Sequence, residues 1–207
     1  MTNGRGRPRD AQIDAAVLEA TEEALDTEGY SGVIIEEVAR RAGVSKTAVY
    51  RRWPNRRHLA LAALADRLGR IEAPNTGCTL CDLHECLVLI TNAFRRLGTG
   101  TLAQLIAEGA DDAELREQLT EIVLEPPRRA VHRSLFDARR RGDLRDDVDL
   151  PLTVDALSSL VFYRLLLGDD PMDPQQIEAV VITLLRGVAA DAGALLREFA
   201  EHEVHLS

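Results

Sequence analysis

The chain has 207 residues, of which 45% are hydrophobic and 29% charged, so it can bury the core of one large domain or two small ones. Its net charge of −9 is uneven, because residues 1–57 carry 10 basic and 9 acidic side chains and the remaining residues carry 15 and 25. This balance excludes a protein that coats nucleic acid or a membrane over its whole surface, and it favours one that binds a polyanion through a single face.

The sequence predicts neither a signal peptide nor a membrane-spanning helix. The first 30 residues lack a continuous apolar segment, and Ser158, Ser159 and Arg164 interrupt the most apolar stretch, 156–167. No run of about 18 apolar residues results. Three cysteines, an odd number, favour a reduced chain over a secreted disulfide scaffold. We therefore expect a cytoplasmic protein without a membrane partner.

Residues 1–9 form a basic arm before the first predicted helix. Arg5 and Arg7 can reach phosphates or a narrow minor groove, and the alternative is a solubilising tail that binds nothing. Apolar residues then recur with helical spacing from Asp10 to Thr27, which predicts a helix that supports the elements after it. Gly29 follows at a position where glycine commonly ends a helix.

The segment from Ile34 to Arg57 has the pattern of a helix-turn-helix motif. Its first helix is predicted by apolar residues at positions i, i+3, i+4 and i+7, namely Ile35, Val38, Ala39 and Ala42. Gly43 follows in the turn, and the Ser45 hydroxyl can cap a second helix. Pro54 limits that helix to about two turns, because helical geometry is disfavoured for the residue before a proline.

Seven basic residues and no acidic one lie between Arg40 and Arg57. Cations along a helix of this size neutralise phosphates and release counterions, so we predict that the second helix enters the major groove. The alternative is a solvated basic face beside an ordinary helical hairpin. The predicted DNA-binding residues are Arg5, Arg7, Ser45, Lys46, Thr47, Tyr50, Arg51, Arg52 and Arg56.

The same segment resembles the DNA-binding domain of TetR-type (TetR/AcrR) transcriptional repressors. The residues that carry the resemblance are Ala39, Gly43-Val44-Ser45, Thr47, Tyr50 and the run Trp53-Pro54-Asn55-Arg56. The resemblance is specific over residues 9–70 and continues, less densely, to about residue 190. The chain differs at Ile34, where such repressors usually have a threonine that caps the helix and can touch a phosphate. About 1 kcal/mol of capping is therefore absent.

Asn55 can cap a fourth helix that runs to about Ile71. Arg56 and Arg57 in its first turn oppose the helix dipole, which suggests an external anion there; in TetR-like proteins this helix start approaches a phosphate. Turn-forming residues at 73–77 mark a domain boundary. The predicted domains are a helix-turn-helix domain at 1–54, a connector helix at 55–72 and a helical ligand-binding and dimerisation domain at 73–207.

The rest of the chain shows helical periodicity and no convincing strand, so the predicted fold class is all-α with about nine helices. Pro126 and Pro127 should kink or break one of them. The stretch Leu152 to Leu167 is apolar almost all round and should be buried on both sides. With the last helix it offers more apolar surface than one small bundle needs, which favours a homodimer through a four-helix interface over a monomeric core.

The resemblance implies a small-molecule cavity among the fifth to eighth helices, whose occupancy moves the DNA-binding heads apart. Asp155 and Arg164 are charges in an otherwise apolar helix and need partners there. Each candidate lining residue can equally belong to the plain core. These candidates are Phe94, Leu97, Leu102, Ile106, Val123, Phe136, Phe162 and Tyr163.

Cys78, Cys81, His84 and Cys86 have the composition of a metal site. In a helix, however, Cys86 points about 140° away from Cys81, so one helix cannot gather the four ligands that zinc requires. We predict no metal and no cofactor. The sequence also lacks a Gly-rich phosphate loop and the G-x-S-x-G and H-E-x-x-H motifs, so we predict no enzyme.

Together these patterns predict a cytoplasmic, homodimeric transcriptional repressor. It would bind a palindromic double-stranded DNA operator and be released by a small hydrophobic inducer. One alternative is a metal- or redox-responsive regulator that uses Cys78, Cys81 and Cys86. Another is a helical enzyme for small molecules, for which the sequence offers no catalytic dyad.

Overall fold

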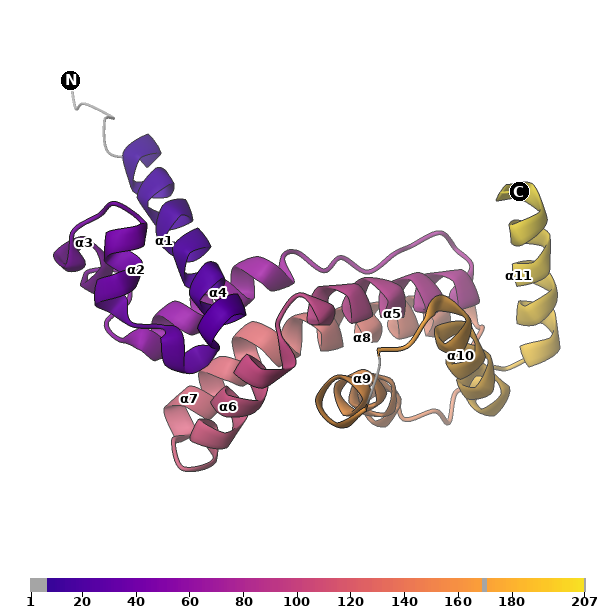
Figure 1. Cartoon of the computed structure of the whole chain (residues 1–207). Helices are drawn as coiled ribbons and strands as arrows, with labels where there is room; N and C mark the ends of the chain where they lie inside the picture. The colour runs from indigo at the N-terminus through magenta and orange to yellow at the C-terminus, as the bar shows by residue number, and fades with distance from the viewer. Residues whose placement is uncertain (1–6, 169–170, 207) are drawn as a thin grey trace, which may run out of the picture. The chain divides into compact units, whose positions relative to one another are not determined.

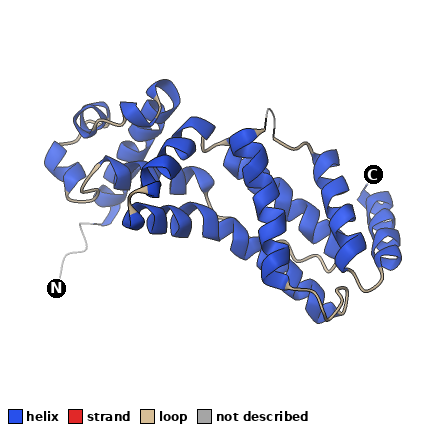
Figure 2. Ribbon diagram, turned by 90° about the horizontal axis from the view of Figure 1, so that it is seen from below, coloured by secondary structure: helices blue, strands red, loops and turns tan. Residues whose placement is uncertain are grey.

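The computed structural model describes residues 7–168 and 171–206, with side chains from 11 to 168 and from 171 to 201. These residues form helices and loops without a β-strand (Figures 1 and 2), and an isolated bridge joins Leu144 to Ala189. The all-α prediction is confirmed. The described residues contain helices α1 to α11, more than the roughly nine predicted. Arg5 lies outside them.

The chain divides into two compact units. Unit 1 comprises Met1–Gly69 and Arg96–Val123, and unit 2 comprises Arg70–Arg95 and Leu124–Ser207. This division differs from the predicted one, which assigned every residue after 73 to a single helical domain. Residues 96–123 join the N-terminal helices instead, because α6 packs on η1 and α7 packs on α4.

Unit 1 is organised around α1, which packs on α2, α4 and η1. Val17, Ala20 and Ala24 lie on its buried face. The helix begins at Arg7, three residues before the predicted start, so the end of the predicted arm is helical. The elements of the unit are α1 (Arg7–Glu28), the short turn η1 (Tyr30–Gly32), α2 (Ile35–Arg41), α3 (Lys46–Tyr50), α4 (Arg56–Leu68), α6 (Thr99–Ala110) and α7 (Ala113–Leu119).

The predicted caps of the helix-turn-helix motif are present. Gly43 has a φ of 65°, which a residue with a side chain rarely adopts. The Ser45 hydroxyl accepts a hydrogen bond from the N–H of Ala48 at 3.2 Å. Asn55 accepts from the two N–H groups at the start of α4, and Gly69, with a φ of 65°, ends that helix before the predicted Ile71.

Unit 2 is organised around α5, which packs on α8, α9, α10 and α11. Leu83, Leu87, Ile90 and Phe94 lie on one face of α5 and are buried, as their spacing predicted. The elements of the unit are α5 (Thr79–Arg95), α8 (Glu125–Arg141), α9 (Leu150–Leu167), α10 (Pro174–Val188) and α11 (Ala192–Leu206).

The helix predicted around the two adjacent prolines is interrupted just before them. Thr120–Leu124 form a π-helical turn, η2, directly before α8. Pro126 and Pro127 then occupy the first turn of α8, where a proline needs no hydrogen-bond donor. The interruption coincides with the boundary between the two compact units.

Helix α9 is not buried on both sides, contrary to the prediction. Leu152, Tyr163 and Leu167 are 66%, 58% and 76% exposed. Among the described residues, α9 is also the one helix long and apolar enough to cross a membrane by length and composition, which the sequence analysis did not anticipate. Its other face packs on α5 and α8, as in a core helix.

Ile34 precedes α2 in extended conformation, and no side chain caps that helix. We expect Ile34→Thr to raise the free energy of unfolding by about 1 kcal/mol. The reason is that a threonine hydroxyl can accept a hydrogen bond from a backbone N–H of the first turn. Ile34 is 53% exposed, so little burial is lost. Urea denaturation followed by circular dichroism measures the change. Ser45→Ala, which removes an existing cap, should lower stability by a similar amount.

Candidate nucleic-acid interface

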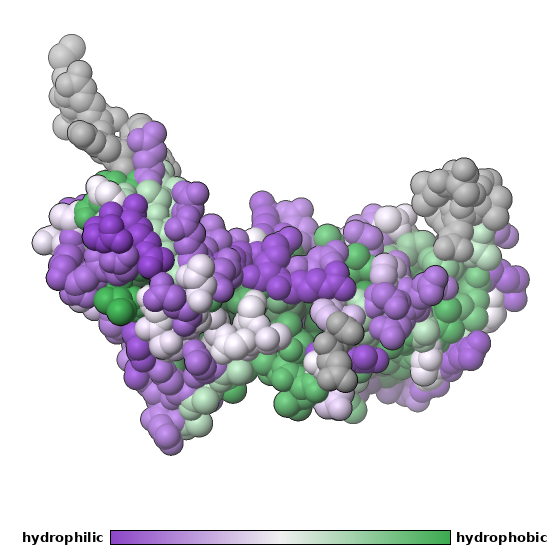
Figure 3. Space-filling model, in the orientation of Figure 1, coloured by the Kyte–Doolittle hydropathy of each residue, from purple (hydrophilic) through white to green (hydrophobic). Residues whose placement is uncertain are grey.

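Helix α3 has one buried and one exposed face. Val49 is fully buried and anchors the helix against α2. Lys46, Thr47, Tyr50 and Arg51 are exposed, and their spacing places them together on the opposite face. The surface over this helix is predominantly hydrophilic (Figure 3). The arrangement offers two cations, a hydroxyl and a phenol on a helix that fits a major groove.

Arg52, which was also predicted to bind DNA, lies apart from this face. Its Nε is ion-paired with Asp14 of α1, and its Nη1 donates to the carbonyl of Ala48 at 3.1 Å. Only 14% of the side chain is exposed. Arg52 therefore ties α3 to α1 and holds the exposed residues in place. The signal that sequence reasoning lacked is the position of Asp14, 38 residues earlier in the chain.

The basic run between Arg40 and Arg57 is partly neutralised by carboxylates from outside it. Glu37 accepts from Arg40 and Arg41, and these hydrogen bonds lower its pKa to about 2. Solvent screens ion pairs at such exposed positions, so they contribute little to stability and phosphates can replace the carboxylates. These exposed pairs are Arg40–Glu37, Arg41–Glu28, Arg41–Glu37, Lys46–Glu36, Arg56–Glu108, Arg57–Glu108 and Arg57–Asp112. The Arg52–Asp14 pair is more buried and is not among them.

The anion expected at the start of α4 is supplied within unit 1. Arg56 lies 3.2 Å from a carboxylate oxygen of Glu108 in α6, and Arg57 is ion-paired with Asp112. The Tyr30 hydroxyl donates to Glu108 at 3.2 Å, and the Arg56 guanidinium lies 4.6 Å from the Tyr30 ring centroid. Burial and the charge of Glu108 raise the pKa of Tyr30. This cluster links α4 to η1, to α6 and to the start of α7, and no spacing along the chain predicts its acidic members.

The predicted cavity residues differ in exposure. Phe94, Leu97, Leu102 and Val123 are buried, whereas Ile106, Phe136 and Tyr163 are 39%, 41% and 58% exposed. The predicted set also divides between the units, with Leu97, Leu102, Ile106 and Val123 in unit 1 and Phe94, Phe136, Phe162 and Tyr163 in unit 2.

A small cavity in the described part of unit 2 touches the predicted set. It has a volume of about 10 Å³ and is lined by Phe94, Thr91, Arg164 and apolar neighbours. The rings of Phe94 and Phe162 meet edge to face, with centroids 4.8 Å apart. Asp155, predicted to need a partner, is ion-paired with Arg128 at 2.5 Å. Asp155 therefore has the partner that its charge requires, and the pair links α9 to α8.

The cysteines do not form the predicted reduced set. Cys78 and Cys81 are joined by a disulfide, and Cys86 is fully buried. Burial raises the pKa of Cys86 to about 12, so it stays a thiol at neutral pH. In the described parts of the chain, no group of three or more His, Cys, Asp or Glu residues could hold a metal ion. A regulator that uses all three cysteines is therefore not favoured.

Two family models match the chain in sequence. "Bacterial regulatory proteins, tetR family" matches residues 17–63, and "Tetracyclin repressor-like, C-terminal domain" matches residues 73–184, more than half of the chain. The chain belongs to the TetR family. It is therefore a DNA-binding transcriptional regulator with a helix-turn-helix motif.

Individual TetR-family proteins are similar over nearly the whole chain. The HTH-type transcriptional regulator YdeS of Bacillus subtilis is 30% identical over 92% of this chain and 96% of its own. The DNA-binding transcriptional repressor TetR of Mycobacteroides abscessus is 29% identical over 88% and 96%. The crystal structure of the TetR family transcription regulator SCO0332 is 36% identical, with a TM-score of 0.67 over 86% of this chain and 98% of that one.

Arg51 and its neighbour Arg52 should respond differently to substitution. We expect Arg51→Ala to weaken operator binding by about 1–3 kcal/mol and to relax specificity at one base pair, as removal of a guanine contact does. Arg52→Ala should instead lower the free energy of unfolding by about 1–3 kcal/mol, because it leaves Asp14 without its partner. Gel shifts over a salt series and thermal unfolding separate the two effects.

Arg133→Ala is the control for this comparison, since Arg133 is an exposed arginine of α8 whose ion pair among the described residues is with Asp137, four residues later. Unchanged DNA binding by Arg51→Ala would remove that residue from the interface. A stable Arg52→Ala protein with weakened DNA binding would show that Arg52 contacts DNA after all.

Proposed function

We propose that this chain is a cytoplasmic transcriptional repressor that binds a palindromic operator as a homodimer and leaves it when a small hydrophobic inducer binds. The exposed face of α3 is the observation that carries the proposal. Thr47 and Tyr50 would hold phosphates, and Lys46 and Arg51 would contact guanine edges in the major groove. Ser45, at the exposed start of the helix, is close enough to join the phosphate contacts.

The homodimer is supported by an apolar groove between α9 and α10. The groove has a volume of about 390 Å³, and hydrophobic surface gathers over α9 (Figure 3). A five-residue recognition helix covers only one half-site, and a symmetric pair of copies covers two. Two helices from each copy would close a four-helix interface. The groove is lined by Ala156, Leu157, Leu160, Ala179, Val180, Thr183 and Leu184.

The proposed release depends on a hydrophobic inducer that separates packed helices. The internal cavity beside Phe94 has room for no ligand at about 10 Å³, so an inducer would have to stabilise a more open arrangement. Phe94, Val161 and Leu165 would then supply apolar contacts, while Arg164 and Thr91 would orient a polar group. Among the predicted cavity residues, Phe94 and its neighbour Phe162 remain the strongest candidates.

The cluster of Arg56, Arg57, Glu108 and Asp112 would relay such a rearrangement to the DNA. It joins the first turn of α4 to α6 and α7 within unit 1. A shift of α6 or α7 would therefore pull on the helix that directly follows the recognition helix. In the DNA complex, phosphates would compete with Glu108 for the same guanidinium groups.

Glu108→Gln tests this competition. Removal of one carboxylate should release Arg56 from its ion pair and make it available to a phosphate. Operator affinity should rise by up to about fivefold, which corresponds to the energy of one exposed ion pair. The gain should shrink at high salt, because phosphate contacts are screened. Glu121→Gln makes the same charge change in an exposed residue of η2 and should leave binding unchanged. Equal effects of both variants would point to net charge rather than to the cluster.

Selection of bound sequences from random duplexes tests the function as a whole. Wild-type protein should enrich a palindrome with two half-sites about one helical turn apart. Leu184→Glu, which places a charge in the groove, should give a monomer by light scattering and enrich no palindrome. Gln175→Glu on the exposed side of α10 is the matched control and should remain dimeric. Failure of the wild type to enrich any sequence would refute the proposed function.

A further inference from the structure

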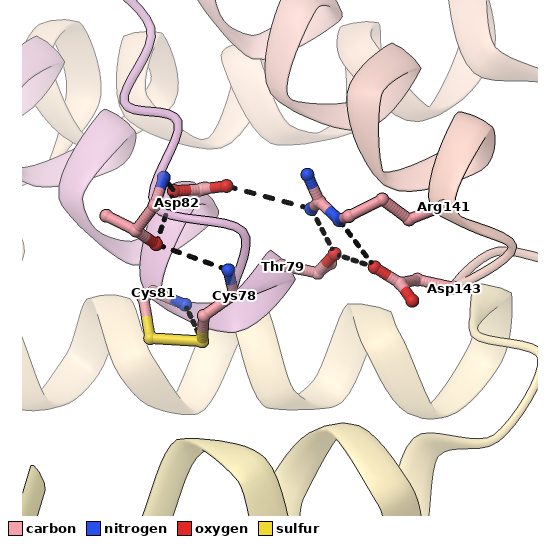
Figure 4. The surroundings of a disulfide bond; sticks show 7 residues. Cys78, Thr79, Cys81, Asp82, Arg141 and Asp143 are labelled. Carbon is pink, nitrogen blue, oxygen red and sulfur yellow. Dashed lines mark hydrogen bonds and ion pairs between the residues drawn. A yellow bond between two sulfur atoms is a disulfide. The ribbon is translucent and has the colours of Figure 1, made fainter. Parts of the chain in front are cut away.

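Cys78 and Cys81 form a Cys-x-x-Cys pair at the start of α5, and DNA binding makes no use of their sulfur chemistry. Their Cα atoms lie 5.2 Å apart, within the range that a disulfide requires, and the two sulfurs are bonded (Figure 4). We propose that the pair is a reversible dithiol–disulfide site that exchanges with low-molecular-weight thiols and disulfides.

The bond has little to contribute as a structural cross-link. The stabilisation from a disulfide grows with the loop that it closes, and this one joins residues only three apart. The same turn is already held by the N–H of Asp82, which donates to the carbonyl of Cys78 at 2.9 Å. Opening the bond therefore leaves the first turn of α5 intact, and reversibility does not require refolding.

Neighbouring polar side chains fix the segment without using either sulfur (Figure 4). The N–H and the hydroxyl of Thr76 donate to Asp82 at 2.7 and 2.8 Å. Arg141 donates to the Thr79 hydroxyl at 2.7 Å and pairs with Asp82 and Asp143. These contacts hold the two cysteines in the same positions in either redox state. The reduced sulfurs therefore stay close enough to form the bond again without a rearrangement of the backbone.

The two cysteines differ in exposure and surroundings. Cys78 is 2% exposed as a residue, whereas Cys81 is half-buried, so we assign the attack of an incoming thiolate to Cys81. Cys78 is then the leaving group. The N–H of Cys81 donates to the Cys78 sulfur at 3.2 Å, and the N-terminal end of α5 stabilises negative charge there.

The exchange is balanced in two steps. In the first, the external thiolate bonds to the Cys81 sulfur, the Cys78–Cys81 bond breaks, and Cys78 takes up the proton that the external thiol lost. In the second, another thiolate attacks the external sulfur of the mixed disulfide, and Cys81 leaves and is protonated. Two external thiols are oxidised to one disulfide while the pair is reduced. A low-molecular-weight disulfide drives the reverse reaction.

The full-length protein is equilibrated in glutathione buffers of graded thiol-to-disulfide ratio, quenched with acid, unfolded and labelled with maleimide. Intact mass should show one transition from three adducts in reducing buffers to one in oxidising buffers. Cys86 supplies the remaining adduct, since it is the cysteine outside the disulfide. Three adducts in every buffer, or one in every buffer, would overturn the proposal.

The site of attack is tested in the native protein. Cys78→Ser, which leaves Cys81, should form a mixed disulfide with glutathione disulfide at least about tenfold faster than Cys81→Ser. The mixed disulfide can also be trapped in wild-type protein after a short reaction with glutathione and located by peptide mapping. This measurement requires no variant, and it should place glutathione on Cys81. Glutathione on Cys78, or equal rates, would overturn the assignment. Neither measurement involves DNA, so both outcomes are independent of the proposed function.

Discussion

The DNA-binding surface depends on how a helix of five residues is held in place. An isolated helix as short as α3 does not persist in water, because too few hydrogen bonds offset the ordering of its backbone. Three contacts replace that missing stability. Val49 is buried against α2, the Ser45 hydroxyl caps the first turn, and Arg52 ties the last turn to Asp14 of α1. The exposed residues of α3 are thereby ordered before DNA arrives.

The cations of unit 1 are paired with carboxylates weakly enough that phosphates can take the carboxylates' place. The cations around α3 and at the start of α4 contact carboxylates at exposed positions, where solvent screens the attraction. A duplex presents many phosphates at once and gains from counterion release. The remainder of the chain carries net negative charge, which disfavours DNA binding there.

Unit 2 has an unsatisfied apolar face. Helix α9 packs one side on α5 and α8 and leaves Leu152, Tyr163 and Leu167 in solvent. Large apolar patches are uncommon on monomers, and a second copy of the same face is the simplest way to cover this one. Helix α9 is thus apolar both where it packs on α5 and α8 and where it faces solvent. For that reason the whole helix has the length and composition of a membrane-spanning helix.

The sequence by itself determined the local structure. Gly43, Ser45 and Asn55 act within four residues along the chain, and the apolar spacing of α5 sets which of its faces is buried, so these features followed from periodicity and capping alone. Only the tertiary structure decided which charges meet. Arg52 reaches Asp14, and Arg56 reaches Glu108 at a separation of 52 residues. Such pairs depend on how helices pack, and no rule of spacing along the chain specifies that.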